Sequence, residues 1–337
     1  MDKLHMLTNP LVTPIKIIAS GIALPKNKID SQELDVRLNK PSGYVKKYSG
    51  IDYRFHANNE DSQAQLAADS LHHALEAKQI PAQSIDMLIS ASAISVQALP
   101  CTAAHILAQS RLKQGIACFD INASCVSFIT ALQVAAGFLS TSQYQRIAIV
   151  SADLASRGID WHDNESALIF GDGAACVIVE KGDGTSGIIT YHHETHTEGI
   201  ELCEIRAGGT RRNPRAGMTD TDFLFHMQGK KLFRMASSLV ERFMQRVLTD
   251  AHLPINHIGT VIPHQASHLS LEHMRQRLGV KPEQLIDIYR FHGNQVAASI
   301  PSALHEAIES GRFYEQKNVM LIGTAAGLAF CAMVLIP

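Results

Sequence analysis

The sequence predicts an α/β fold built from two similar halves, and three observations indicate it. First, apolar β-rich runs alternate with helical segments along most of the 337 residues, which is typical of mainly parallel sheets covered by helices. Second, residues 119–153 and 288–325 share the order strand, tight polar turn, helix, polar linker and apolar strand. Third, the helical part of Ile116–Ser142 is almost without charge, so we expect it to be buried on all sides.

The first half has a regular alternation of elements. Asp30–Ser31 caps a short helix, residues 40–57 are expected to form a surface loop, and Ser62–Ala77 has the spacing of an amphipathic helix. The other elements of this half are strands at 15–24, 85–93, 116–121, 146–151, 169–180 and 188–191, and helices at 100–112 and 125–142.

The second half follows an irregular connector that is rich in Gly and Arg. Helices are predicted at 225–251, 267–278 and 294–310, the last with Pro301 at a kink, and strands at 258–262, 285–289, 318–323 and 328–336. We therefore expect an N-terminal half over 1–196, a connector over 197–224 and a C-terminal half over 225–337. If the halves pack together, the helices after Cys125 and Asn294 begin at a shared centre and bring both residues into one site.

Composition excludes several classes of function. The net charge of −2 does not predict a nucleic-acid partner, and no apolar run is long enough to span a bilayer. The N-terminus lacks a basic-then-apolar signal pattern, so a cytoplasmic protein without a membrane partner is expected. The six cysteines show no CxxC pair and no metal-ligand spacing, so we expect free thiols and no metal site.

Cys125 stands where a predicted strand gives way to a helix, after a turn at 122–124. The first turn of a helix carries unpaired N–H groups and the positive end of the helix dipole, and both favour a thiolate. Such a site can lower a cysteine pKa from about 8.5 to about 3.5–7.5, which makes Cys125 a candidate nucleophile at the end of a channel. The alternative is a core cysteine without chemistry, which is the commoner case.

Two polar residues of the second half stand in similar places. His264 follows a strand in Pro-His-Gln-Ala, and Asn294 precedes a helix in Gly-Asn-Gln-Val-Ala-Ala-Ser-Ile-Pro. Each alone has a structural alternative as a cap. Together with Asn-Ala-Ser-Cys at 122–125, these motifs resemble the thiolase superfamily and, more narrowly, β-ketoacyl-acyl-carrier-protein synthase III and its relatives. The resemblance extends over nearly the whole chain and includes the Gly-Asp-Gly-Ala-Ala turn at 171–175.

The resemblance implies a thiolase-like fold with an αβαβα layered core, and a reaction in two steps. Cys125 would take an acyl group from a thioester, and a malonyl-type thioester would then lose CO₂ and attack that group to give a β-ketoacyl product. His264, as a neutral ring, and Asn294 would each donate a hydrogen bond to the enolate oxygen. One such donor typically lowers the activation free energy by roughly 2.7–4 kcal/mol. The backbone N–H groups of Cys125 and Ala326 would hold a second oxyanion. No resident cofactor is implied, because the substrates are thioesters of coenzyme A or of an acyl carrier protein.

Several positions depart from the pattern of the acetyl-CoA-using relatives. The residues that would clamp the CoA adenine correspond here to Tyr44 and Asn164 in place of a Trp and an Arg, so a carrier protein or another thioester can be the acyl donor. Glu165 is a candidate helper base, although a surface acid is the plainer interpretation. The loop 324–327 has two alanines where glycines are usual, and alanine resists positive φ, so its course can differ.

Other features concern partners and metals. Leu99–Pro100 resembles a segment that reaches into the acyl pocket of a second subunit, so a homodimer is expected. Tyr191–His196 has the residues of a metal cluster without the His-Glu-x-x-His spacing, and we interpret it as a solvated strand end. A basic loop is either ordinary surface charge or a landing site for a carrier protein. It consists of Arg206, Arg211, Arg212 and Arg215.

Three functions follow from these residues. The first is a condensing acyltransferase, the second is acyl transfer from Cys125 to an alcohol or amine without decarboxylation, and the third is a non-catalytic partner subunit. An intact Cys–His–Asn set argues against the third. Cys331, the only late cysteine, lies in an apolar run, and a core position for it favours the decarboxylating branch over a thiolase. The acyl chain, its carrier and the pathway (fatty acid, polyketide or signal molecule) stay open.

Overall fold

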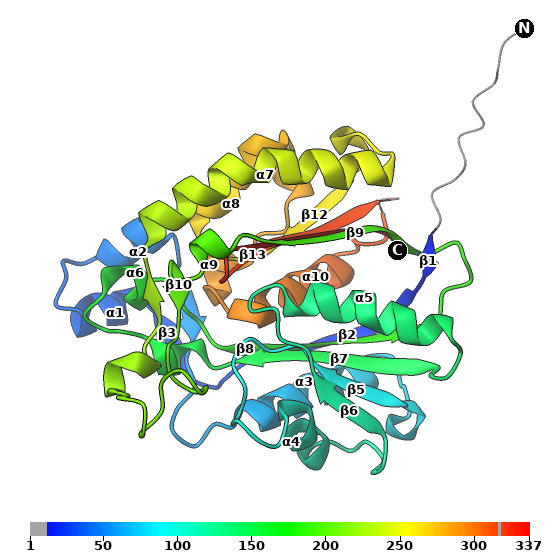
Figure 1. Ribbon diagram of the computed structural model, residues 1–337, viewed down its shortest axis with the longest axis horizontal. Helices are drawn as coiled ribbons and strands as arrows, with labels where there is room; N and C mark the ends of the chain where they lie inside the picture. Colours follow the sequence, from blue (N-terminus) through cyan, green and yellow to red (C-terminus); the bar gives the residue numbers. More distant parts are fainter. Residues whose placement is uncertain (1–11, 316–317) are drawn as a thin grey trace, which may run out of the picture.

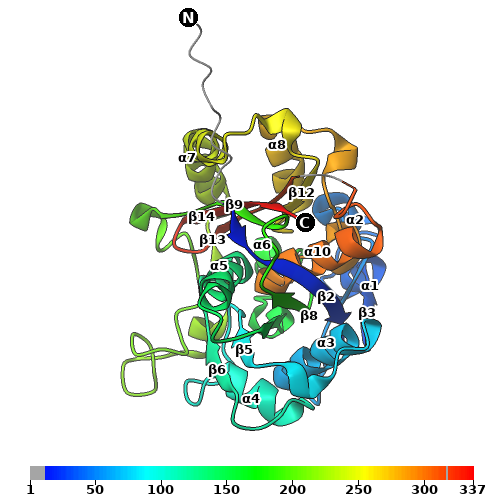
Figure 2. The same ribbon diagram turned by 90° about the vertical axis from the view of Figure 1, so that its right-hand side faces the viewer.

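A computed structural model describes residues 12–315 and 318–337. Residues 1–11, part of the stretch in which we predict no signal pattern, lie outside them. Two five-stranded sheets alternate with three layers of helices, so the predicted αβαβα order is confirmed (Figures 1 and 2). α5 (Ser127–Ser140) and α10 (Ser299–Glu309) lie between the sheets, where one hydrophobic core joins them to both.

The outer helices are amphipathic and each pair covers one sheet. α3 (Gln63–Ala77) and α4 (Thr102–Gln109) pack on the first sheet, and α7 (Gly229–Ala251) and α8 (His268–Leu278) pack on the second. α3 can approach its sheet closely because Gly21 has no Cβ. A Cβ there would lie 2.4 Å from a backbone nitrogen of α3.

The first sheet contains mostly buried, β-branched strands. Its order is β2-β8-β7-β5-β6, with β2 at Lys16–Ala23, β8 at Gly173–Glu180, β7 at Arg146–Asp153, β5 at Met87–Ser90 and β6 at Ala117–Asp120. The second has the order β1-β9-β14-β13-β12, with β1 at Thr13–Pro14, β9 at Gly187–Thr195, β14 at Ala329–Ile336, β13 at Val319–Ala325 and β12 at Thr260–Pro263.

Strand direction differs from the prediction of mainly parallel sheets. Only β5 with β6, β5 with β7, and β12 with β13 pair in parallel, and the other neighbours in the two sheets are antiparallel. Apolar runs show that both faces of a strand are buried, but they carry no information on direction. β9 belongs to the predicted N-terminal half, but it pairs with β14 of the predicted C-terminal half in the second sheet. The domain boundary at 196 stays a prediction.

Smaller elements complete the fold. The short helices are α1 (Ser31–Arg37), α2 (Tyr44–Ser49), α6 (Asn164–Ala167) and α9 (Tyr289–His292). Two hairpin-like pairs join β3 (Lys28–Asp30) to β4 (Tyr53–Phe55) and β10 (Cys203–Glu204) to β11 (His226–Met227). Of these smaller elements, α6, β10 and β11 line the pocket that contains Cys125.

Most predicted elements are confirmed, including the cap at Asp30, but two local predictions are wrong. The expected loop 40–57 contains α2 and β4. The expected strand 285–289 makes only one isolated bridge before α9. Pro301 lies in the first turn of α10, which begins at Ser299, and proline is tolerated there because its missing N–H has no partner to lose. The kink expected at Pro301 stays a prediction.

Candidate active site

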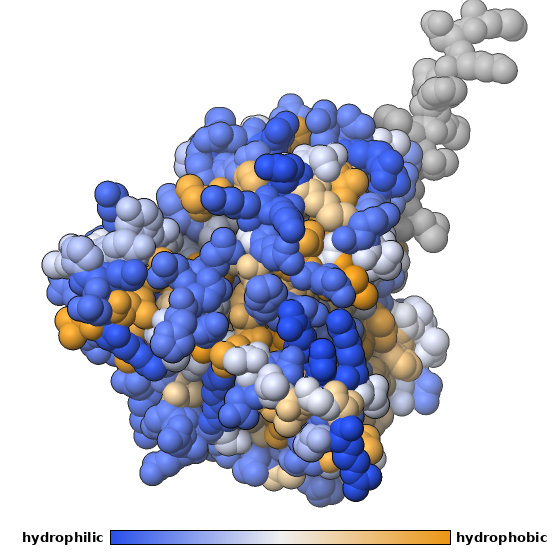
Figure 3. Space-filling model, turned by 60° about the vertical axis from the view of Figure 1, so that its left-hand side comes forward, coloured by the Kyte–Doolittle hydropathy of each residue, from blue (hydrophilic) through white to orange (hydrophobic). Residues whose placement is uncertain are grey.

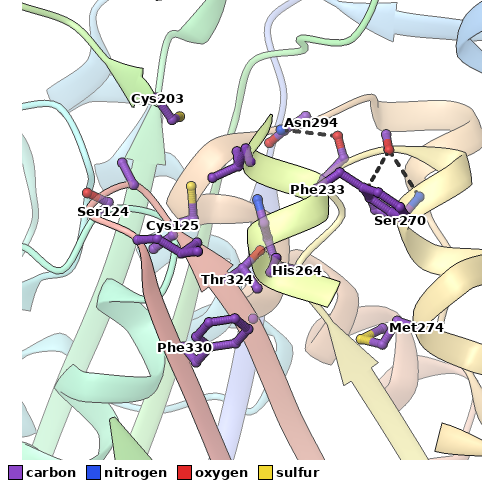
Figure 4. A pocket seen from close by; sticks show the side chains of 18 of the residues that line it. Ser124, Cys125, Cys203, Phe233, His264, Ser270, Met274, Asn294, Thr324 and Phe330 are labelled. Atoms are coloured by element: carbon purple, nitrogen blue, oxygen red, sulfur yellow. Dashed lines mark hydrogen bonds between the residues drawn. The ribbon is translucent and has the colours of Figure 1, made fainter. Parts of the chain in front are cut away.

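One large pocket contains the three predicted side chains. It has a volume of about 1390 Å³, and its lining includes Cys125, His264, Asn294 and residues 324–327. Figure 4 shows the sulfur of Cys125 and the ring of His264 side by side, with Asn294 above them. The chain brings them together because α5, β12 and the segment before α10 all end or begin at the centre of the molecule.

Cys125 lies two residues before α5, in a turn that the Ser127 side chain holds by hydrogen bonds to the backbone. The Ser127 hydroxyl accepts the Ala123 N–H at 2.9 Å and donates to the Ser124 carbonyl at 2.6 Å. Ser124 has φ of +52°, a left-handed conformation that costs a non-glycine residue about 1–2 kcal/mol. The surrounding hydrogen bonds must therefore hold this turn, which aims the thiol into the pocket.

The acidity of Cys125 differs from the prediction. Burial raises the pKa of its thiol, and neighbouring Cys203 and Asp153 raise it further, whereas the backbone N–H groups of Cys125 and Ala326 lower it. The expectation of a lowered pKa is therefore wrong, because desolvation outweighs the donors at the helix terminus. The same two N–H groups donate to the sulfur, and the oxyanion role that the resemblance implies for them stays a prediction.

His264 follows β12 and is only 7% exposed. Its backbone N–H donates to the Ile322 carbonyl at 2.8 Å, which fixes it beside β13. Burial lowers the pKa of the imidazole to about 4, so the ring is neutral at pH 7. Its Nδ1 is buried and has no hydrogen-bond partner within the described residues. The neutral ring itself lines the pocket.

Asn294 is held by backbone pairing and by both ends of its amide. Its N–H donates to the Ile169 carbonyl at 2.8 Å, and the N–H of Gly171 donates to its carbonyl at 3.1 Å. Its Oδ1 accepts the Val296 N–H at 2.9 Å, and its Nδ2 donates to the Ala266 carbonyl at 3.3 Å. These contacts orient Nδ2 toward the His264 segment and leave one amide hydrogen for a ligand.

The Gly-Asp-Gly-Ala-Ala turn supports Asn294 from the other side. A Cβ on Gly171 would lie 1.9 Å from the His292 carbonyl oxygen, so only glycine permits this approach. In the loop 324–327 only Gly327, at +133°, has a positive φ, so neither alanine adopts the conformation that alanine resists. A course that differs from that of the relatives stays a prediction.

Two residues of the site escape sequence reasoning. Cys203 of β10 lines the pocket near Cys125 (Figure 4), and nothing in its irregular surroundings predicts this. Asp153 ends β7 and accepts N–H groups from Ala93, Ile94 and Ala297 at 3.0–3.2 Å. A carboxylate at the end of an apolar strand was a visible signal for it.

The remaining predicted pocket residues have mixed outcomes. Glu165 lines the pocket and its Oε2 accepts the N–H of Gly229 at 2.9 Å, at the start of α7. Tyr44 and Asn164 are not among the lining residues. Tyr44 stacks on Tyr48 at 4.4 Å between ring centroids, because α2 turns it onto its own helix, and Asn164 opens α6. Leu99 also lies outside the lining and is 84% exposed.

The basic loop is partly neutralised. Arg206 pairs with Glu204 at 3.0 Å, and Arg211 pairs with Glu201 and Glu204 at 3.5 and 3.4 Å. Within the described residues, Arg212 and Arg215 pair with no carboxylate; Arg212 donates to the Gly217 carbonyl at 3.4 Å.

The histidine-rich end of β9 contacts carboxylates. His192 pairs with Asp250 at 2.9 Å, and His196 with Glu194 at 3.5 Å. Over 12–315 and 318–337, no group of three or more His, Cys, Asp or Glu residues could hold a metal ion. Across the same residues, every helix is too short or too polar to traverse a bilayer.

Comparisons with known proteins agree with the geometry. Family models described as 3-oxoacyl-[acyl-carrier-protein (ACP)] synthase III and its C-terminal part match residues 119–198 and 248–336, which include Cys125, His264 and Asn294. The β-ketoacyl-[acyl-carrier-protein] synthase III of Neisseria meningitidis serogroup B is 28% identical over 320 residues, covering 95% of this chain and 98% of that protein. The one from Synechocystis sp. is 29% identical over 339 residues, covering 97% and 99%. The crystal structure of the Aquifex aeolicus enzyme has a TM-score of 0.85 at 28% identity, covering 96% and 100%.

Proposed function

The chain belongs to the β-ketoacyl-acyl-carrier-protein synthase III-like enzymes of the thiolase superfamily, and on this premise we propose how its own residues divide the work. It is an acyltransferase with a thiolase-like α/β fold, and its reaction is acyl transfer to a cysteine followed by decarboxylative condensation. The observation that carries the assignment of roles is the convergence of Cys125, His264 and Asn294 on one pocket.

In the first step, Cys125 attacks the carbonyl carbon of an acyl thioester. The oxyanion forms beside the N–H groups of Cys125 and Ala326, which already donate to the sulfur. When the oxyanion collapses, the bond to the carrier sulfur breaks and the thiol proton ends on the leaving thiol. Because burial raises the pKa of Cys125, the thiolate must form as the bond forms and not before.

In the second step, a malonyl-type thioester loses CO₂ and leaves an enolate. The neutral ring of His264 and the amide of Asn294 each donate a hydrogen bond to the enolate oxygen. One such donor typically lowers the activation free energy by roughly 2.7–4 kcal/mol. The enolate carbon attacks the acyl group on Cys125, a C–C bond forms, and the cysteine sulfur leaves as a thiolate that takes a proton from solvent, which gives the β-ketoacyl product and restores the thiol. Apart from that proton, the thioesters supply every reacting group, so the proposed reaction needs no resident metal or cofactor.

The test follows both steps by mass spectrometry. The protein receives an acyl thioester and a malonyl thioester, and we expect an acyl group on Cys125, release of CO₂ and a β-ketoacyl thioester. An acylated Cys125 without CO₂ release in the presence of both substrates would favour transfer to an alcohol or amine. A chain that accepts no acyl group from coenzyme A or carrier-protein donors would be a non-catalytic partner subunit.

We propose a homodimer formed through β6. This strand is the edge of the first sheet, pairs only with β5 within the described residues, and is half-buried along its whole length. An unpaired apolar edge favours pairing with a second chain, and Leu99 projects nearby as a fully exposed leucine that a partner would cover. Light scattering should give twice the chain mass, and Leu99→Asp should increase the monomer fraction.

We propose that the unpaired cations of the basic loop, Arg212 and Arg215, meet an acidic carrier protein. Replacing both with alanine should raise KM for a carrier-linked thioester several-fold and leave KM for the coenzyme A thioester unchanged. Arg206 and Arg211 are matched controls, because Glu204 and Glu201 already compensate their charge. Equal effects on both thioesters would exclude a docking role. A cytoplasmic location, without a membrane or nucleic-acid partner, stays a prediction.

A further inference from the structure

The pocket is larger than the chemistry at Cys125 requires. Its volume of about 1390 Å³ exceeds the roughly 300–1,000 Å³ that is usual for small-molecule sites. The additional space runs between α7 and α8, because the lining follows α7 from Gly229 to Leu248 and α8 from Leu269 to Leu278. At about 1.5 Å rise per residue, the stretch along α7 spans roughly 28 Å.

The lining changes from polar to apolar along this path. Near the mouth it includes Glu165, Lys230, Ser267 and Ser270. The part between the helices, here named the interhelical chamber, is lined by aliphatic and thioether side chains over a floor of Leu328 and Phe330. These side chains are Val240, Met244, Leu248, Leu271, Met274 and Leu278. On the face drawn in Figure 3, hydrophilic residues dominate, and hydrophobic ones gather in a hollow near its centre.

Two contacts bridge α7 and α8 near the mouth. The Ser237 hydroxyl and Nε2 of His273 are 3.2 Å apart, and the rings of Phe233 and His273 are 4.7 Å apart between centroids. Beneath this bridge, Ala236 and Val240 stay partly exposed although they belong to the apolar face of α7. Both side chains contact the hydrophobic core on one side and line the pocket on the other. The chamber is therefore open space along the apolar face of α7.

We propose that the interhelical chamber holds a linear aliphatic acyl chain, that of the thioester from which Cys125 takes its acyl group. The inference rests on the proposed function and specifies its donor. The chamber offers length and apolar contact but few polar partners, which suits methylene groups and not the amides of a phosphopantetheine arm. Flexible methionines, Met244 and Met274, adapt to a mobile chain. A long-chain acyl thioester is therefore the preferred donor.

The experiment measures acyl loading of Cys125 by mass spectrometry with butanoyl, octanoyl, dodecanoyl and hexadecanoyl thioesters. Each buried methylene can contribute roughly fourfold, so loading efficiency should rise at least tenfold from butanoyl to dodecanoyl. Ala236→Phe fills the chamber and should reduce dodecanoyl loading roughly tenfold while butanoyl loading stays within about twofold. Met274→Ala lengthens the chamber and should shift the preference from dodecanoyl toward hexadecanoyl.

Ser238→Phe is the matched control. It adds the same ring to α7 two residues further on, where the side chain is exposed and outside the pocket lining, and its chain-length profile should equal that of the wild type. Calorimetry with dodecanoic acid and Cys125→Ala gives a second readout, and the binding heat should disappear when Ala236→Phe is added. Loading of Cys125 with no preference for chain length, or an Ala236→Phe profile lowered equally at every length, would overturn the chamber assignment alone. Absence of loading by every thioester would instead overturn the proposed function.

Discussion

The turns that enter the two central helices are built alike. In each, an asparagine accepts the backbone N–H of the residue two positions ahead, at 2.9 Å, and donates to the carbonyl of an alanine that stands three residues after a strand. The asparagines are Asn122 before α5 and Asn294 before α10. Their alanine partners are Ala93 at 2.8 Å and Ala266 at 3.3 Å.

The match continues into the helices. A serine in the first turn of each helix accepts the backbone N–H four residues back: Ser127 from Ala123 at 2.9 Å, and Ser299 from Gln295 at 3.0 Å. In each turn the residue two positions after the asparagine has φ of +52°. The two turns are therefore one structural unit used twice, and the counterpart of Asn294 is Asn122, not Cys125 as the sequence comparison implied.

The difference between the two turns lies in which position carries chemistry. The first turn presents Cys125 three residues after its asparagine, where the second has Ala297. The second is joined by His264 directly after its strand, where the first has Ala91. Asn294 is buried and Asn122 is exposed. A duplicated turn can thus be specialised by single residues, one copy for a nucleophile and one for oxyanion donors.

The largest effect should follow the loss of the thiol. Cys125→Ala should reduce formation of the acyl-enzyme and of the β-ketoacyl product by a factor of at least roughly 10³, because no other group of the first turn can form a thioester. Mass spectrometry of the protein measures the loading. Cys203→Ala removes the other thiol of the pocket and should still be acylated; if Cys203 carries the acyl group instead, the assignment of the first turn is wrong.

The two asparagines should separate the two half-reactions. Asn294→Ala should reduce condensation by roughly 10²–10³-fold, since an oxyanion donor is lost, with acylation of Cys125 retained. Asn122→Ala should do the opposite and slow acylation, because it releases the Cys125 turn. Stopped-flow loading and single-turnover condensation on pre-acylated protein measure the steps separately. Equal losses in both steps for both variants would show that the turns are not specialised.

The serines should give a smaller and symmetrical effect. Ser127→Ala and Ser299→Ala each remove one buried hydrogen-bond acceptor from a backbone N–H, which should lower the free energy of unfolding by about 1–3 kcal/mol. Urea unfolding measures this. In kinetics, Ser127→Ala should affect loading and Ser299→Ala should affect condensation. A variant with unchanged unfolding free energy would indicate that the hydrogen bond from the backbone N–H to the serine hydroxyl does not stabilise the turn.

The last comparison concerns the pH dependence of stability and Asp153, whose carboxylate accepts N–H groups from both turn regions. Burial raises the pKa of Asp153 from 3.8 to about 7, so the folded protein retains a proton that the unfolded chain releases in this interval. Its contribution to stability is therefore complete below pH 3.8 and is lost as the pH rises through 7. Burial lowers the pKa of His264 to about 4, and its contribution has the opposite sign, being lost as the pH falls from 6.5 to 4.

Asp153→Asn isolates the first of these contributions. Because the variant has no titrating group at this position, the difference in unfolding free energy between the wild type and the variant should shrink as the pH rises from about 5 to 7.5. Urea unfolding at both pH values measures it. A difference that grows with pH would mean that Asp153 is ionised and stabilised in the folded chain.

Sequence alone predicted two halves of alternating strands and helices and singled out Cys125, His264 and Asn294, whereas the αβαβα layers were implied by the resemblance to the thiolase superfamily. The alternation rests on apolar periodicity and the three residues rest on short flanking motifs. Both are local signals that do not depend on contacts with the rest of the chain. The predicted helix bounds lie close to the observed ones for the same reason. The short strand predicted at 285–289 is wrong, because the apolar residues there pack into the core without forming a hydrogen-bonded ladder with a neighbouring strand.

Only the tertiary structure decided the features that depend on contacts between distant segments. It set the directions of the strands, brought Cys203 to the pocket, buried Asp153 behind Cys125, aligned Asn122 with Asn294, and opened the chamber between α7 and α8. It also reversed the expected shift of the Cys125 pKa. A helix terminus is visible in a sequence, but desolvation by residues more than a hundred positions away is not, and in a buried site desolvation is the larger of the two.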